Sequence, residues 1–277
     1  MILNRDIFIL FIIAFASSLI ALSIRDEPMA KSNKLSQLLI QDSSIHFDAI
    51  QEIVVIKDGE QFQYKLIEGK WWQVFPYQTR MNSVSMSAII RSVQSVQILG
   101  ELPETINHST LGLEKQTNAI SLTDGNEVLN IKLGRKTLGG RAYAQVGESL
   151  PAIVDQTLHR QITDADHRLW RDVRMFPDFA IDGIRIERVV NGEKLLLDRA
   201  SGRWEMLEPV TARVDQDVLL EWVGKLASIQ IESFVVDNPT DLAMFGLHIP
   251  VASFLVHDRK DTAYHLLVGG RVSSGSQ

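Results

Sequence analysis

The residues that could perform chemistry in this chain of 277 residues are seven histidines, two pairs of aspartates and one glycine-rich basic stretch. The histidines form no i, i+4 pair and no H-E-x-x-H motif, the spacings that place two zinc ligands on one helix face. They are His46, His108, His159, His167, His248, His257 and His265. A metal site would need these side chains to converge through tertiary structure, so the sequence predicts no metal ligand.

Two aspartate pairs, Asp164 with Asp166 and Asp215 with Asp217, have the residue type needed for acid–base catalysis or for a hard cation. Both pairs fall at predicted helix ends. Aspartate there accepts hydrogen bonds from free backbone N–H groups and interacts favourably with the helix dipole. We therefore interpret both pairs as helix caps rather than as catalytic residues.

The glycine-rich basic stretch spans residues 133–141 (LGRKTLGGR). It lacks the G-x4-G-K-[ST] order of a phosphate-binding loop and lies between predicted strands rather than before a helix. We interpret it as a hairpin connection, with anion binding as the weaker alternative. No serine lies in a G-x-S-x-G elbow, and the chain has no cysteine for a thiol nucleophile, a disulfide, an iron–sulfur cluster or a lipoprotein lipid. The sequence thus predicts neither catalytic residues nor a bound cofactor.

The charge balance argues against a nucleic-acid partner. Lysine and arginine total 28 and aspartate and glutamate 34, which leaves a formal net charge of -6 and no basic field for a phosphate backbone. The hydrophobic share of 45% and the charged share of 22% are those of globular proteins. At about 150 residues per domain, the length corresponds to a little under two domains.

An uncharged N-terminal run begins at Ile7, ends at Ile24 and has the length of a membrane span. Its 18 residues reach about 27 Å as a helix, close to the roughly 30 Å hydrocarbon core of a bilayer. We expect a signal anchor in residues 1–25, because the run is longer than the apolar core of most cleaved signals. A cleaved signal peptide, with Ala21-Leu22-Ser23 as the cleavage site, is the alternative. We expect residues 26–49 to be a polar tether and the bulk of the chain to lie outside the cytoplasm.

The rest of the chain contains an internal repeat with an offset of 133 residues. Residues 53–98 align with residues 186–231 without a gap, and ten of the 46 pairs are identical, where unrelated segments share about three. The pair Trp71 and Trp204 is among the identities. A tryptophan that recurs at the same position of both copies favours a role in packing the core. We therefore expect both tryptophans to lie in hydrophobic cores rather than to form a surface that binds a ligand.

Each copy has the pattern of a sheet with one helix packed on it. Asp58-Gly59 and Asn191-Gly192 stand between alternating apolar segments, which is the strongest short signal for a type I′ hairpin. A strand with the tryptophan follows and ends at a proline. Asn82 and Asp215 then precede apolar residues at helical spacing, which predicts an N-cap and a helix in each copy.

The predicted fold class is α+β, with an N-terminal transmembrane helix followed by two tandem copies of a curled antiparallel sheet with a packed helix. The first copy occupies residues 50–180 and the second residues 181–277. We expect the second copy to be truncated, because the first continues through two more strands and a helix near Gln156 to Asp164. Either the sequence is shortened or the sheet ends at an exposed edge, which natural proteins usually avoid.

A basic segment with a tryptophan lies between the two copies. Its candidate partner-docking residues are Arg168, Trp170, Arg171, Asp172 and Arg174. Tryptophan and arginine are enriched in interface hot spots, which favours docking. Salt bridges to a sheet edge are the simpler interpretation, and the sequence leaves both open.

The order of these motifs resembles the bacterial domain-of-unknown-function family 4340. The resemblance covers residues 50–271 and rests on the hairpins, a G-[KR]-W-x4-P motif at Gly69 and Gly202, an [LF]-G-L turn at Leu111 and Phe245, and residues 167–172. It implies one N-terminal membrane helix and an extracytoplasmic repeat region. It also implies genes beside ABC-type export components and gliding-motility auxiliary proteins, and it implies no catalytic residue.

Together these features predict a non-enzymatic, membrane-anchored extracytoplasmic accessory or scaffold protein of an ABC-type transport or envelope complex. The expected location is the bacterial inner membrane. The expected partners are the membrane, through residues 7–24, and ABC-type transporter subunits. The alternative is an envelope ligand-binding protein or hydrolase with a site between the two repeat units. The sequence leaves the oligomeric state open.

Overall fold

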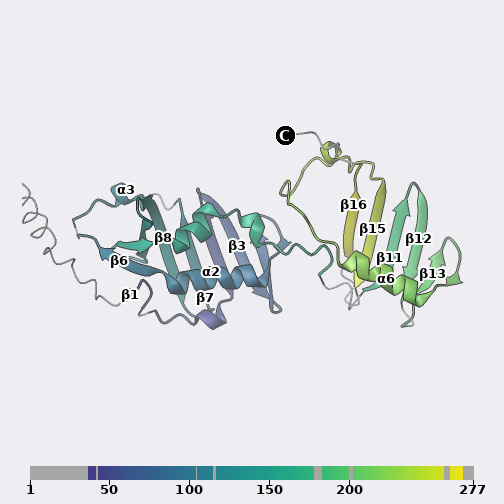
Figure 1. The fold of residues 1–277 in the computed structure, drawn as a ribbon, viewed down its shortest axis with the longest axis horizontal. Helices are drawn as coiled ribbons and strands as arrows, with labels where there is room; N and C mark the ends of the chain where they lie inside the picture. The colour runs from purple at the N-terminus through teal and green to yellow at the C-terminus, as the bar shows by residue number, and fades with distance from the viewer. Residues whose placement is uncertain are drawn as a thin grey trace, which may run out of the picture.

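The computed structural model describes residues 37–41, 43–103, 105–114, 117–177, 183–199, 202–258 and 263–270. In these residues the chain is mostly antiparallel β-structure in two sheets, with a few helices (Figure 1). This confirms the two antiparallel sheets of the predicted fold. The expected transmembrane helix lies outside the described residues, and none of the helices within them is long and apolar enough to cross a membrane.

Both sheets have a fixed strand order. The first sheet runs β1 (Gln37–Leu38), β6 (Gln97–Glu101), β10 (Ala152–Asp155), β9 (Arg141–Val146), β8 (Val128–Thr137), β7 (Ala119–Thr123), β2 (Glu52–Lys57), β3 (Glu60–Ile67), β4 (Lys70–Phe75) and β5 (Thr79–Arg80). The second sheet runs β14 (Ala212–Arg213), β13 (Glu205–Glu208), β12 (Glu193–Asp198), β11 (Gly183–Val190), β15 (Ala252–Asp258) and β16 (Ala263–Val268). The helical segments are η1 (Phe47–Ala49), α2 (Ser83–Ser95), α3 (His108–Leu111), α4 (Thr157–His159), η2 (Arg160–Asp164), η3 (His167–Trp170), α6 (Gln216–Ala227) and η4 (Ala243–Phe245).

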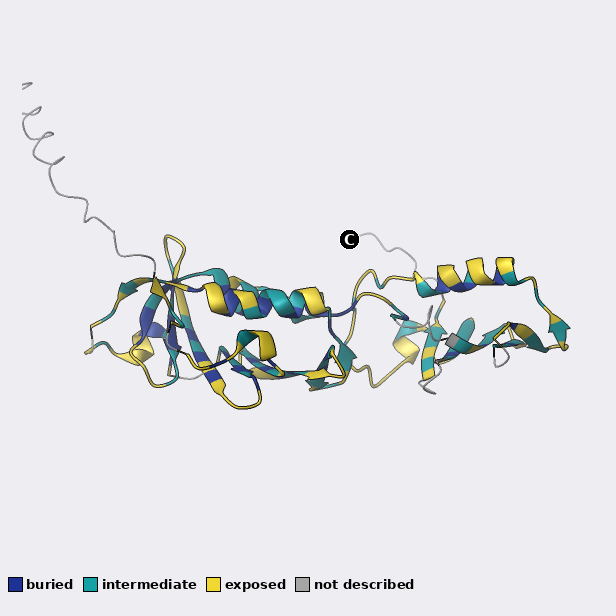
Figure 2. Cartoon of the chain, turned by 90° about the horizontal axis from the view of Figure 1, so that it is seen from below, coloured by how far each residue is buried: buried dark blue, intermediate teal, exposed yellow. Residues whose placement is uncertain are grey.

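The first sheet buries one face because side chains alternate along its strands. Ile53 and Val55 of β2 and Phe62 and Tyr64 of β3 are buried, whereas the residues between them are more exposed. Helix α2 lies on the buried face and turns its own buried residues toward the sheet, as Figure 2 shows for both α2 and α6. The two cores therefore lie between a sheet and its helix.

Helices α2 and α6 begin at the predicted N-caps. The side chain of Asn82 accepts hydrogen bonds from the N–H groups two and three residues later, at 2.8 and 3.2 Å. The carboxylate of Asp215 does the same at 3.0 and 3.3 Å. Each cap satisfies backbone donors that would otherwise lack a partner and contributes about 1 kcal/mol.

The second sheet repeats the element order of the first. Strand β14 and helix α6 start 133 residues after β5 and α2. Strands β11 to β14 correspond to β2 to β5, and β15 and β16 correspond to β7 and β8, with the same neighbours in each sheet. Both tryptophans are buried as predicted, since Trp71 is 6% exposed and Trp204 is 2% exposed. In the described residues, β16 pairs with β15 alone.

The segment expected to be a tether contributes to the first unit. Gln37 and Leu38 form β1 against β6, and the N–H of Leu39 donates to the carbonyl of Val96 at 2.8 Å. The side chain of Ile45 is buried in the core. Backbone pairing with β6 does not depend on apolar side chains, so a polar composition did not reveal it. The first unit therefore begins before residue 50.

A close backbone approach recurs in both sheets, and a glycine permits it. A Cβ atom at Gly134 in β8 would lie 2.4 Å from the carbonyl oxygen of Leu111. At Gly269, directly after β16, it would lie 2.6 Å from the carbonyl oxygen of Phe245. Both carbonyls belong to the [LF]-G-L turn, whose central glycine is left-handed in each unit. The turn can reach the strand only where the strand carries no side chain.

Replacement of Gly134 by alanine should destabilise the chain by about 1–3 kcal/mol, because the new methyl group must displace a backbone carbonyl rather than a flexible side chain. The control is Gly224→Ala in α6, where a Cβ atom meets nothing within 4 Å. Alanine should there stabilise the helix by up to about 1 kcal/mol. Thermal unfolding measures both effects. An unchanged Tm for Gly134→Ala would contradict the close approach.

Candidate functional site

The backbone after η3 joins the two units. Arg171 forms an antiparallel bridge with Met81, next to β5 of the first unit. Four residues later, the N–H of Met175 donates to the carbonyl of Ile229 at 3.0 Å, directly after α6 of the second unit. The ring of Phe176 is buried in the second core. The sequence predicted that the second unit begins at residue 181. Because Met175 and Phe176 already contact the second unit, its contacts begin before that residue.

A polar cluster surrounds Arg171 between the units, and we call Tyr77, Arg168, Arg171, Phe234 and Asp237 the junction cluster. The Arg171 side chain is 4% exposed. Its guanidinium lies 5.2 Å from the ring centroid of Tyr77 and 4.8 Å from that of Phe234, and it donates to the Tyr77 hydroxyl. Its Nη2 lies 2.8 Å from Oδ1 of Asp237, while Nε of Arg168 donates to Oδ2 at 3.0 Å. One carboxylate of the second unit therefore pairs with two guanidiniums of the first.

Burial and pairing shift the pKa values at this junction. Burial acts to raise the pKa of the Asp237 carboxyl, but hydrogen bonds from Arg171 and Arg168 outweigh it and hold the pKa below its ordinary value. Burial, and then the charge of Arg171, lower the pKa of His167, whose ring centroid lies 4.2 Å from that of Phe62. At neutral pH the junction thus holds an ionised carboxylate beside a neutral imidazole.

The five candidate docking residues differ in how much of each side chain solvent reaches. Trp170, Arg171 and Asp172 are buried, with exposed fractions of 3%, 4% and 7%. The side chains of Arg168 and Arg174 are 34% and 52% exposed, and each is bonded to an aspartate. All five make contacts within the chain, but not in one cluster: Arg168 and Arg171 pair with Asp237, Arg174 pairs with Asp172, and Trp170 packs in the first core. Their docking of a partner stays a prediction, for which Arg168 and Arg174 present the accessible side chains.

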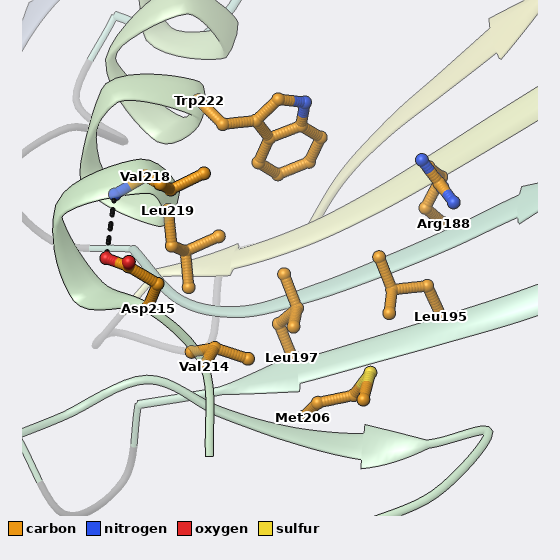
Figure 3. A pocket seen from close by; sticks show the side chains of 9 residues that line it. All are labelled: Arg188, Leu195, Leu197, Met206, Val214, Asp215, Val218, Leu219 and Trp222. Atoms are coloured by element: carbon orange, nitrogen blue, oxygen red, sulfur yellow. Dashed lines mark hydrogen bonds between the residues drawn. The ribbon is translucent and has the colours of Figure 1, made fainter. Parts of the chain in front are cut away.

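An open apolar groove of about 380 Å³ lies between α6 and the second sheet, and we call it the α6 groove. Figure 3 shows Trp222 and Leu219 extending from α6 toward the leucines of β12. The groove is lined by Arg188, Leu195, Leu197, Met206, Val214, Asp215, Val218, Leu219 and Trp222. The floor residue Leu197 is 4% exposed and the rim residue Val218 is 65% exposed. The Asp215 carboxylate is engaged as the cap of α6, so Arg188 is the other charged group of the lining.

A second hollow, of about 440 Å³, is polar. It is lined by Lys57, Asp58, Glu60, Phe62, Asp164, Asp166, His167 and Arg168. The Asp164 carboxylate lies 2.6 Å from Nζ of Lys136, and Asp166 accepts the backbone N–H of Arg168 at 2.9 Å as the cap of η3. The capping interpretation is thereby confirmed for Asp166, as it is for Asp215.

The remaining sequence candidates are dispersed. In the part of the chain that the structure describes, no group of three or more histidine, aspartate or glutamate side chains is arranged to hold a metal ion. Nδ1 of His46 lies 3.3 Å from Oδ2 of Asp124. His159 is buried, and its Nε2 lies 3.2 Å from the carbonyl oxygen of Gly134. Residues 133–141 form the end of β8, a turn and the start of β9, which confirms the hairpin connection.

The sequence reasoning missed Tyr77, Phe234 and Asp237, because no motif or periodicity marks these loop residues. Their importance arises only where the two units meet. A signal did exist for Arg188, which the repeat alignment places opposite Val55, a buried position of β2. A charged residue at the inward position of one copy indicates that the two copies differ in what covers the sheet.

The chain consists of two similar α+β units. A segment of the second unit matches a known family. Residues 204–277 match the family model described as Domain of unknown function (DUF4340), which confirms the resemblance that the motifs indicated. The matched segment contains α6, β15 and β16. No curated protein and no solved structure shows significant similarity to the chain.

The substitution Asp237→Asn should loosen the contact between the units. The substitution leaves Arg171 buried without its carboxylate and should lower the free energy of unfolding by about 2–3 kcal/mol. Breaking a fully buried ion pair lowers it by about 3–5 kcal/mol, and the smaller figure applies here because the Asp237 side chain is 19% exposed. Hydrogen exchange should become faster at the Met175 N–H. The control Glu221→Gln removes an acid from an exposed pair with Lys225, worth under about 0.5 kcal/mol. Equal exchange in the two variants would sink this role for Asp237.

Acid should weaken the wild type more than the Asp237→Asn variant. The pKa values of the Asp237 and Asp172 carboxyls lie below the ordinary value, because hydrogen bonds from arginine outweigh burial. A carboxyl whose pKa is lower in the folded state than in the unfolded state stabilises the fold. This stabilisation is complete at pH values above the unfolded pKa of about 3.9, and it is lost as the pH falls through the folded pKa. The urea concentration at which half of the wild-type chain is unfolded should therefore decrease when the pH is lowered below about 4. A drop of the same size in the variant would contradict the assignment.

Proposed function

We propose that this chain is a non-enzymatic accessory or scaffold protein, anchored in the bacterial inner membrane by residues 7–24, with its two units on the extracytoplasmic side. Its partners are subunits of an ABC-type transport or envelope complex. The observation that carries this proposal is the α6 groove, because an open apolar surface on a folded unit favours the binding of a partner.

The groove has the chemistry of a protein-binding surface. Leucine, methionine, valine and tryptophan side chains form most of its lining, and the carboxylate at its edge is engaged as a helix cap. Burial of such a surface contributes about 25 cal/mol for each Å² of apolar area. Catalysis would require a positioned nucleophile, acid or base, whereas Arg188 is the one charged side chain of the lining without a capping role. The composition of the groove therefore favours recognition over reaction.

The location in this proposal is supported by the N-terminus and by the family resemblance. The run from Ile7 to Ile24 has 18 uncharged residues, enough for a span of about 27 Å. The resemblance to family 4340 implies an extracytoplasmic repeat region and genes beside ABC-type export components. The absence of cysteine from the sequence agrees with export.

A second candidate is an envelope ligand-binding protein or hydrolase. The polar hollow next to the junction favours it, because carboxylates and the imidazole of His167 converge there. The bonds of Asp164 to Lys136 and of Asp166 to the η3 backbone speak against free catalytic carboxylates. The hollow therefore supports ligand binding better than hydrolysis.

Co-purification from the native membrane tests the first proposal. The full chain, tagged and solubilised in detergent, should bring down a transporter permease or ATPase that mass spectrometry identifies. A version without residues 1–24 should leave the membrane fraction and lose these subunits, because it lacks the anchor. Recovery of the full chain alone, from a membrane that contains such a transporter, would contradict the accessory role. A wild-type chain found cleaved and free of the membrane would contradict the anchor.

A further inference from the structure

The tip of the hairpin between β8 and β9 carries the most exposed large apolar side chain of the described residues. Leu138 is 97% exposed. It follows Thr137, the last residue of β8, and precedes Gly139 and Gly140, whose φ angles of +78° and +76° turn the chain back into β9. Among the described residues, a Cβ atom at either glycine would meet nothing within 4 Å. The tip therefore projects into solvent rather than onto the body of the first unit.

The hairpin also extends past the strand beside it. The pairing of β8 with β7 ends at Lys132, whereas β8 continues to Thr137. Residues 133–137, at about 3.3 Å each, place the tip roughly 16 Å beyond this last pair. The side-chain amide of Gln156 donates to the carbonyls of Thr137 and Arg141 at 3.2 and 2.9 Å and holds the base of the hairpin. The tip is thus a protrusion with a supported base.

Cations flank the apolar tip. Arg135, Lys136 and Arg141 are exposed and lie within three residues of Leu138. Nζ of Lys136 lies 2.6 Å from Oδ1 of Asp164, and the two guanidiniums form no ion pair in the part of the chain that the structure describes. Guanidinium groups bind phosphate oxygens through paired hydrogen bonds. The anion binding that the sequence left as the weaker alternative for this stretch therefore has two accessible arginines to perform it.

An apolar tip between arginines has the chemistry of a membrane-surface contact. A leucine gains free energy when it enters the boundary between lipid headgroups and acyl chains, and arginines beside it are attracted to anionic headgroups. A single exposed leucine on a protein surface needs no explanation. Here full exposure, projection from the sheet and two unpaired arginines coincide at one tip. This combination favours an anionic lipid surface.

The strand register places the hairpin close to Gln37, the first described residue. Gln37 of β1 pairs with Ile98 of β6. Ile98 pairs with Val154 of β10, which pairs with Ala142 of β9. Three spacings of about 4.8 Å separate β1 from β9, so Gln37 lies roughly 14 Å across the sheet from Ala142. The base of the hairpin and the start of the first unit therefore lie on the same part of the sheet.

The length of chain before Gln37 keeps this part of the sheet near the bilayer. Residues 25–36 separate the proposed anchor, which ends at Ile24, from Gln37. Fully extended, this stretch reaches about 45 Å at most. The second unit attaches at the opposite edge of the sheet, next to β5 (Figure 1). The hairpin is therefore within reach of the bilayer that holds residues 7–24.

We propose that the tip of the β8–β9 hairpin is a lipid-contact loop. Leu138 enters the headgroup–acyl boundary of the bilayer that holds residues 7–24, and Arg135 and Arg141 bind the phosphates of its anionic lipids. The proposal rests on the proposed function for the anchor and adds a second membrane contact, which orients the first unit on the membrane. One apolar side chain alone binds a bilayer weakly, and the anchor compensates by raising the local concentration of lipid at the loop.

The test uses single cysteine labels, because the chain contains no cysteine of its own. The full chain with Leu138→Cys, labelled with the fluorophore NBD, is reconstituted into vesicles of phosphatidylcholine and phosphatidylglycerol. A spin-labelled lipid that quenches at the headgroup boundary should quench this label about threefold more strongly than a label at Leu150→Cys. Leu150 is the matched control, because it is 58% exposed and follows the turn at the opposite end of β9.

Removal of two cations tests the contribution of charge. Arg135→Gln with Arg141→Gln, in the Leu138→Cys chain, should lower the ratio of docked to undocked label by about tenfold or more, because each basic side chain near an anionic surface contributes about fivefold. High salt should act in the same direction. The control Arg91→Gln with Lys225→Gln makes the same change in net charge on the exposed surfaces of α2 and α6, and it should leave the ratio unchanged.

Four results would overturn the lipid-contact loop. The first is a label at residue 138 that lipid quenches no more strongly than the label at residue 150. The second is equal quenching in vesicles of phosphatidylcholine alone, which would remove anionic lipid from the assignment. The third is protection from iodide in solution without quenching by lipid, which would assign the tip to a protein contact. The fourth is release by inorganic phosphate but not by chloride at equal ionic strength, which would assign the arginines to a free anion.

Extraction of the vesicles at alkaline pH separates this proposal from the anchor. A chain that stays in the vesicles after extraction but shows no quenching at residue 138 would refute the lipid-contact loop and leave the anchor standing. A chain that shows quenching before extraction and is then removed from the vesicles would support the loop and refute the anchor.

Discussion

A sheet with one apolar face has to be covered, and a single helix is too small to cover a large one. Ten strands at about 4.8 Å spacing span roughly 43 Å, whereas the 13 residues of α2 form a rod about 20 Å long. In the first unit a second helical segment, residues 157–170, lies beside α2 over the same sheet (Figure 1). In the second unit α6 lies on six strands, and the groove is the part of the apolar face that it leaves open.

The cover of the first unit is continuous with the connection to the second. Trp170 closes the first core, and the next residue, Arg171, is the centre of the junction cluster. Its charge is accepted in a buried position because Asp237 neutralises it and two aromatic rings flank it. The packing of residues 157–170 and the attachment of the second unit are therefore made by adjacent residues of one backbone segment.

Much of the local structure could be predicted because it depends on residues a few positions apart. The hairpin turn at Asp58-Gly59 requires left-handed backbone at both positions, and the caps at Asn82 and Asp215 act on N–H groups within three residues. Strand β1 was missed for the opposite reason. Its pairing with β6 uses backbone groups that every residue carries, so its polar sequence suggested a tether.

The sequence by itself determined the repeat, the turns, the caps and the inward positions of the strands, because period and spacing along the chain set them. Only the tertiary structure decided what stands over those inward positions. Tyr77 and Arg171 meet across 94 residues of chain, and Arg168 and Asp237 across 69, and no local rule relates such partners. The same limit applies to the α6 groove, since an apolar lining and an apolar core have the same sequence pattern until a covering segment is either placed or absent.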